Sequence, residues 1–165
     1  MKIAFLLNEK PTSLEIEPRE TLAEVLRTRC RLMGLKLSCE AQVCGSCTVL
    51  VDGLPVSACT YLAYEVRDKR VTTIEGLADS AGRLHPLQQA FLDNFAFQCG
   101  FCTPGMILAA KSLLDQNVRA SDEEIIAYMS ANLCRCTGYL GILKAIRQAA
   151  AELQGHTEAS GRTRE

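Results

Sequence analysis

Nine cysteines in a chain of 165 residues most constrain what this sequence can fold into. Eight of them fall into two sets of four. The first set has the spacing C-x4-C-x2-C-x11-C and consists of Cys39, Cys44, Cys47 and Cys59. The second has the spacing C-x2-C-x31-C-x-C and consists of Cys99, Cys102, Cys134 and Cys136. Any stable fold must bring each set together, because clustered thiols in a reducing compartment usually bind metal.

The start of the chain, the apolar content and the charge indicate a cytoplasmic protein. The apolar run at residues 3–7 is too short for a secretory signal, and no cleavage site with small residues follows it. No stretch approaches the roughly 20 apolar residues of a membrane span. The net charge of −1 gives no basic surface for nucleic acid. We therefore expect no membrane span, no nucleic acid and reduced thiols.

The first half predicts a small mixed sheet crossed by one helix. Apolar residues alternate in residues 3–7 and 14–16, as in half-buried strands. A capping box of Thr21 and Glu24 predicts the start of a helix that continues to Cys30. Asp52-Gly53 between two apolar runs predicts a hairpin, and residues 70–78 supply a last strand.

The second half predicts four helices. Pro86 and Pro104 suit the first turns of helices that run to about residue 95 and residue 117. Ser121 and Glu124 form a capping box for a third helix, to about residue 133, and the fourth covers residues 139–153. This pattern predicts a four-helix bundle. The chain is thus expected to be α+β, with domains at 1–77 and 86–155, a connector at 78–85, and a disordered polar tail at 156–165.

The first cysteine set has the order of plant-type [2Fe–2S] ligation. A long loop of this kind can direct several backbone N–H groups at a cluster, and Gly45 lacks a side chain where the backbone must pass closest. A structural zinc site is the alternative. Zinc sites usually present two short C-x2-C knuckles, whereas only one such pair is present here. The order therefore favours iron–sulfur over zinc.

The second set places each cysteine pair at a junction between expected helices. Thr-Pro-Gly follows Cys102 and Thr-Gly follows Cys136. Free N–H groups at helix N-termini stabilise the charge of thiolates and sulfides. Taken alone, this set is ambiguous between iron–sulfur and zinc, and the neighbouring first set reduces the ambiguity.

Three stretches, "CGSCTVLVDG", "QCGFCTPGMI" and "NLCRCTGY", together resemble the small iron–sulfur subunit of the xanthine oxidase family of molybdenum hydroxylases. The likeness is greatest to the separate small subunits of three-subunit bacterial enzymes such as aerobic carbon monoxide dehydrogenase. It extends over about residues 1–153. The resemblance implies a plant-ferredoxin-like β-grasp domain followed by a four-helix [2Fe–2S] domain.

The same resemblance implies a route for electrons and the residues that serve it. The first set would hold the cluster nearer FAD, and the second would hold the cluster facing a molybdopterin-type cofactor. Gln98 and Cys136 match the family positions that contact the pterin. The pterin would belong to a large subunit and FAD to a medium subunit, in an expected dimer of heterotrimers. Gln42 departs from the family, which more often has a small residue at that position of the loop.

The other polar candidates have simpler interpretations. Cys30 lies on the apolar face of the first expected helix and is expected to be a core residue. His85 precedes Pro86 and is expected to be a turn residue at a helix start. Arg135 either solvates its loop or pairs with a carboxylate of a partner.

The expected function is therefore electron transfer within an oxidoreductase complex. No Ser/His/Asp set and no phosphate-cradling loop is present, so no catalytic residue is expected on this chain. Two alternatives remain at this point: a free-standing ferredoxin with two clusters, and a zinc-stabilised interaction module.

Overall fold

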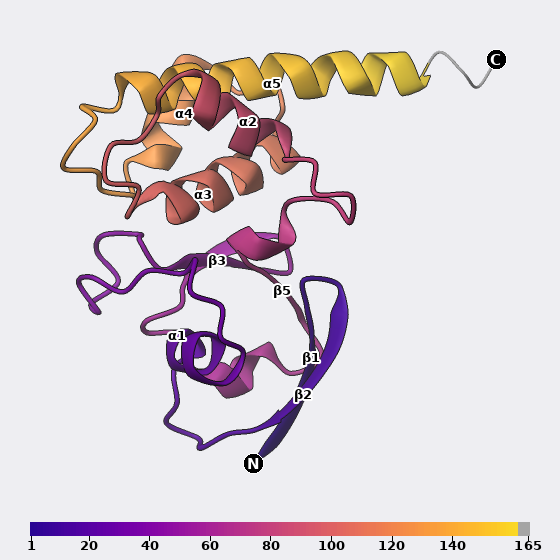
Figure 1. The fold of residues 1–165 in the computed structure, drawn as a ribbon, viewed down its shortest axis with the longest axis vertical. Coiled ribbons are helices and arrows are strands. Elements are labelled where there is room, and N and C mark those ends of the chain that lie inside the picture. The colour runs from indigo at the N-terminus through magenta and orange to yellow at the C-terminus, as the bar shows by residue number, and fades with distance from the viewer. Residues whose placement is uncertain (162–165) are drawn as a thin grey trace.

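The protein consists of a β-sheet half and a helical half stacked on one another (Figure 1). A computed structural model describes residues 1–161, and the side chains of residues 1–155. Each half has its own buried apolar cluster, one formed within residues 3–71 and one within residues 87–150. The coarse prediction of an α+β chain is confirmed.

The sheet half is a mixed five-stranded sheet of order β2-β1-β5-β3-β4. Only β1 and β5 pair in parallel; the other neighbours are antiparallel. The strands are β1 (Lys2–Leu7), β2 (Lys10–Glu15), β3 (Thr48–Val51), β4 (Leu54–Ser57) and β5 (Arg70–Thr72). The predicted hairpin is confirmed, since Asp52 and Gly53 join β3 to β4 with φ of 50° and 81°. The last strand is shorter than expected, because a 3-10 turn, η3 (Ile74–Gly76), follows it.

The first helix differs from the regular helix expected to reach Cys30. The Thr21 and Glu24 capping box is confirmed, but α1 (Leu22–Glu24) soon widens into a π-helical turn, η1 (Val25–Arg29). In that turn Cys30 N–H donates to the Val25 carbonyl, five residues earlier. Cys30 itself is half-buried and packs against the core of the sheet half. A second short 3-10 turn, η2 (Ala63–Val66), precedes β5.

The helical half contains α2 (Pro86–Asp93), α3 (Thr103–Gln116), α4 (Asp122–Met129) and α5 (Leu140–Gly161). The capping box of Ser121 and Glu124 is confirmed. His85 is the N-cap of α2, and its Nδ1 accepts a hydrogen bond from the Leu87 N–H at 3.2 Å.

Two helices end earlier than expected. After α2, Phe95 has a left-handed φ of 48°, and after α4, the Leu133 N–H is bound by the first cysteine loop instead of by its own helix.

The last helix continues further than the sequence indicated. α5 includes residues 156–161, which were expected to begin a disordered tail. No proline interrupts the helical hydrogen bonds of this polar stretch. Residues 162–165 of the expected tail lie outside the described residues. None of the helices described here is both long and apolar enough to span a bilayer.

Candidate iron–sulfur centres

The first cysteine loop is built around backbone N–H groups. Glu40, Gln42 and Gly45 adopt left-handed φ values of 51°, 58° and 68°, which curl the chain around Cys39. As a result, the N–H groups of residues 41, 43 and 44 all donate to Cys39 Sγ at 3.4 Å. These hydrogen bonds lower the pKa of the exposed Cys39 thiol to about 6. The loop therefore favours the thiolate, the form that binds metal.

The other end of this set is buried in the sheet half. Cys47 is 3% exposed, and burial raises the pKa of its thiol to about 11. The Cys59 side chain, just beyond β4, interacts with it. Cys39 interacts in the same way with Cys44. The four cysteines predicted as one ligand set are thus brought together as two thiol pairs, and Cys44 of one pair also interacts with Cys47 of the other. Cys39 is exposed, Cys47 is buried, and the other two are half-buried.

The second set is assembled from two loops far apart in sequence. Cys99 and Cys102 lie between α2 and α3, and Cys134 and Cys136 lie between α4 and α5. Cys136 Sγ lies 3.6 Å from Cys99 Sγ, while Cys102 interacts with Cys134. Burial raises the pKa of Cys102 to about 12, and the Cys134 thiol adds to the rise. Again the structure brings the predicted four residues together as two pairs.

Cys134 is held by side chains that the sequence did not single out. Burial by itself raises the pKa of Cys134, but hydrogen bonds from Thr137 and from the Cys136 N–H outweigh burial and lower it. The Thr137 hydroxyl lies 3.1 Å from Cys134 Sγ. The Tyr139 hydroxyl accepts a hydrogen bond from the Cys134 N–H at 2.8 Å. The pattern of cysteines alone gave no sign of Tyr139, because its contact depends on the loop closing back on itself.

Each set offers four thiols to a metal centre. All nine cysteines are free of disulfides. A structural zinc ion takes four ligands around one centre, and a [2Fe–2S] cluster takes two ligands on each of its two irons. Two thiol pairs in each set suit the two irons of such a cluster.

Gln98 and Cys136 lie together, although 38 positions separate them. The Gln98 side-chain amide donates to the Cys136 carbonyl at 3.0 Å, and both residues are exposed. Arg135, between the two thiols, is also exposed. These three residues are therefore an exposed part of the second site, where a partner chain could contact it.

One short segment connects the two sites. The Leu133 N–H donates to the Cys44 carbonyl at 2.9 Å, immediately before Cys134. The adjacent Asn132 is 4% exposed, and its amide donates to the Gly45 carbonyl at 2.9 Å. Neither residue stands out in the sequence, since no local pattern marks a contact across more than 80 positions.

Two glycines allow this close approach. A Cβ on Gly45 would lie 2.4 Å from the Asn132 amide nitrogen and 2.9 Å from the Ala131 carbonyl oxygen. A Cβ on Gly105, in the first turn of α3, would lie 2.3 Å from the Gly45 carbonyl oxygen. Gly45 was expected to let the backbone pass close to a cluster, and that stays a prediction; what the structure shows is a close approach of the other half of the chain at this glycine.

Gln42, the departure from the family pattern, also has a left-handed φ of 58°. Glycine or another small residue suits this conformation more easily. Here the Thr60 hydroxyl donates to the Gln42 side-chain oxygen at 3.0 Å. The loop therefore accommodates the bulkier residue by binding its side chain to the residue after Cys59.

Two protein families match this chain, and together they cover both sites. Residues 5–78 match the family described as "2Fe-2S iron-sulfur cluster binding domain". Residues 73–147 match the family described as "[2Fe-2S] binding domain". The fold and the paired thiols thus define a protein with two [2Fe–2S] binding domains.

Two bacterial relatives are similar over most of their length. The nicotine 6-hydroxylase small subunit of Paenarthrobacter nicotinovorans is 44% identical, with 93% of this chain and 92% of the relative covered. The nicotinate dehydrogenase small FeS subunit of Eubacterium barkeri is 47% identical, with 87% of this chain and 90% of the relative covered.

Solved structures share the fold. Quinoline 2-oxidoreductase from Pseudomonas putida 86 has a chain that superposes with a TM-score of 0.90 at 44% identity, covering 94% of this chain and 96% of that one. The aldehyde oxidoreductase of Desulfovibrio desulfuricans superposes with a TM-score of 0.89 at 41% identity, and this chain spans 17% of that longer chain. The protein belongs to the small [2Fe–2S] iron–sulfur subunits of the xanthine oxidase family of molybdenum hydroxylases. It is an electron-transfer subunit of an oxidoreductase complex.

Proposed function

We propose that the two cysteine sets hold one [2Fe–2S] cluster each and that electrons cross this chain from the helical site to the sheet site. The ligands would be Cys99, Cys102, Cys134 and Cys136 in the helical half and Cys39, Cys44, Cys47 and Cys59 in the sheet half. When bound, each cluster carries one electron at a time. The protein holds the thiolates, excludes water around the buried ones and sets the potentials through hydrogen bonds.

The hydrogen bond from the Leu133 N–H to the Cys44 carbonyl is the observation that carries this proposal. Leu133 is covalently joined to Cys134, so a ligand of each site lies at either end of one short backbone bridge. Each site also has exposed cysteines: Cys39 in the sheet site, and Cys99 and Cys136 in the helical site. An electron could thus enter at the exposed part of one site and leave at the exposed part of the other, which suits a relay between two partners.

We assign the partners by the surface that each exposed end offers. Gln98 and Cys136 would face a pterin on a large molybdopterin-binding subunit, and the end near Cys39 would face FAD on a medium subunit. The complete assembly would be a dimer of heterotrimers. The relatives are named for nicotine, nicotinate, quinoline and aldehydes, yet all resemble this chain. A subunit shared across such different substrates does not choose among them, so the substrate pocket would belong to the large subunit.

The domain division and the location are part of the same proposal. Residues 1–77 would form the ferredoxin-like β-grasp domain, 78–85 the connector, and 86–155 a four-helix bundle. The separate core clusters of the two halves support this division. Nine cysteines without disulfides support a reducing, cytoplasmic location.

Native mass spectrometry of the protein purified from its own host, combined with iron, sulfide and zinc analysis, tests the proposal. We expect a complex with two further chains, and about four irons and four sulfides per small subunit, as two [2Fe–2S] clusters require. A lone monomer carrying the same iron would support a free-standing ferredoxin instead. A colourless protein containing zinc would reject both electron-transfer functions.

A further inference from the structure

Threonine follows a cysteine of the two sets at four places. The four threonines are Thr48, Thr60, Thr103 and Thr137, after Cys47, Cys59, Cys102 and Cys136 respectively. Three of them have hydroxyl partners near a site. Thr48 donates to the Gly45 carbonyl at 2.7 Å, Thr60 to the Gln42 side chain, and Thr137 to Cys134 Sγ.

Thr103 is the exception. Its Oγ1 is buried, and among the described residues it is the single buried side-chain nitrogen or oxygen without a hydrogen-bond partner. A buried hydroxyl without a partner is costly, so a native structure normally supplies an acceptor. The absence of a partner for this one hydroxyl therefore points to an acceptor outside the protein atoms.

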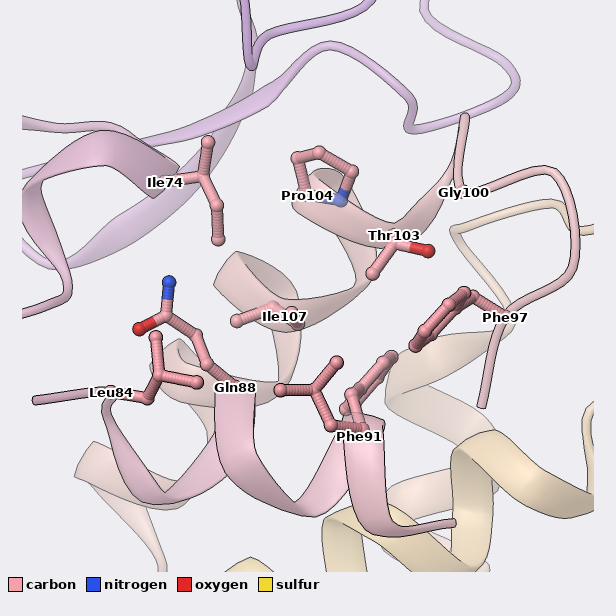
Figure 2. Close-up of a pocket in the computed structure, with 10 residues that line it drawn as sticks. Ile74, Leu84, Gln88, Phe91, Phe97, Gly100, Thr103, Pro104 and Ile107 are labelled. Atoms are coloured by element: carbon pink, nitrogen blue, oxygen red, sulfur yellow. The ribbon is translucent and has the colours of Figure 1, made fainter. Parts of the chain in front are cut away.

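The surroundings of Thr103 limit what that acceptor can be. An apolar pocket lies between α2 and α3, and Ile74, Leu84 and Ile107 are part of its lining. Figure 2 shows that the Thr103 hydroxyl points away from these three side chains. Thr103 directly follows the half-buried Cys102, which belongs to the second cysteine set and is the N-cap of α3. The hydroxyl is thus directed away from hydrocarbon and belongs to the residue next to a proposed ligand.

We propose that the Thr103 hydroxyl donates a hydrogen bond to a sulfur of the [2Fe–2S] cluster in the helical half and thereby raises the reduction potential of that cluster. Reduction adds negative charge to the cluster, and a hydrogen-bond donor stabilises the reduced form more than the oxidised form. Thr137 provides a parallel within the same site, since its hydroxyl already donates to a ligand sulfur. This inference rests on the ligand set proposed above for the helical half.

Thr103→Val in the intact complex is the principal test, because valine keeps the shape and removes the hydroxyl. We expect a redox titration followed by EPR to show a roughly tenfold smaller equilibrium constant for reduction of the helical-half cluster, about 59 mV for one electron. Thr103→Ser keeps the donor and should titrate close to wild type. Thr60→Val removes a threonine hydroxyl in the sheet half and should leave the helical-half potential unchanged.

A second measurement does not depend on the potential. After exchange into D2O, pulsed EPR of the reduced helical-half cluster should detect the deuteron of the hydroxyl group in the wild type and in Thr103→Ser. The same signal should be absent in Thr103→Val. An unchanged potential and an unchanged deuteron signal in Thr103→Val would show that the hydroxyl does not contact the cluster, and would overturn the inference. Absence of a helical-half cluster from the wild-type complex would instead overturn the proposed ligand set.

If Thr103→Val fails to assemble, Thr103→Ala and Thr103→Ser are compared in the same titration. A lower potential in the alanine variant alone supports the hydrogen bond. Equal potentials in the alanine and serine variants reject it.

Discussion

The two cysteine sites position their thiols in different ways, one mainly through the backbone and the other mainly through side chains. In the sheet half, one loop of nine residues supplies three cysteines, and backbone N–H groups of that loop surround Cys39. In the helical half, the cysteines come from two loops, and side chains of Thr137, Tyr139 and Gln98 hold the second loop in place. A site built from backbone tolerates many side-chain changes, whereas a site built from side chains depends on each of them and on the packing of the helices.

The two sites are also joined. Asn132 and Leu133 reach from the helical half to the carbonyls of Gly45 and Cys44. A change at the bridge should therefore disturb both sites, and a change within one site should disturb only that one. The variants below separate these two cases, from the largest expected effect to the smallest.

Cys136→Ser should abolish the helical-half cluster and leave most of the sheet-half cluster in place. A serine oxygen is a poor substitute for a thiolate on iron, and the exposed Cys136 is not one of the two bridge residues, Asn132 and Leu133. EPR of the reduced protein should show two [2Fe–2S] signals in the wild type and one in the variant. Persistence of both signals would contradict the ligand assignment, and loss of both would contradict the independence of the sites.

Gly45→Ala should destabilise the protein by roughly 3 kcal/mol, because the new Cβ would meet Asn132 and the backbone of Ala131. Chemical denaturation measures this loss, and EPR should show both signals altered. Gly53→Ala is the matched control: its φ of +81° is equally left-handed, but nothing lies within 4 Å of the added Cβ. We expect the control to lose about 1 kcal/mol from backbone strain alone. Equal losses in the two variants would show that the contact between the halves is not tight.

Tyr139→Phe should weaken the helical site more than the sheet site. The Cys134 N–H would lose its acceptor, at a cost of about 1 kcal/mol, while the Asn132 carbonyl would lose only a longer hydrogen bond of 3.4 Å. Iron release from that cluster to a chelator, followed by the decay of its EPR signal, should be about fivefold faster. The sheet-half cluster serves as the internal control, and faster release from it as well would show that Tyr139 supports the bridge between the sites rather than one site.

Much of the fold was predictable because its signals are local. The Asp52-Gly53 hairpin, the capping boxes of Thr21 and Ser121, and the prolines at helix starts each depend on a few neighbouring residues. The helix ends were less predictable. The end of α4 at Met129 is one example: the Asn132 N–H turns back to the Met129 carbonyl, and the Leu133 N–H binds the carbonyl of Cys44, almost 90 residues earlier in the chain.

The sequence by itself determined the chemistry of this protein. Eight cysteines at fixed spacings predicted two iron–sulfur sites and, with the motifs around them, indicated the family to which the chain belongs. Spacing carries this information because the protein supplies thiolates in a set order and the cluster supplies the reactivity. Only the tertiary structure decided how the thiols pair, that Asn132 and Leu133 join the two sites, and that the Thr103 hydroxyl lacks a partner. Those contacts arise when α3 packs on β3 and brings together residues far apart in sequence, and no local pattern encodes that packing.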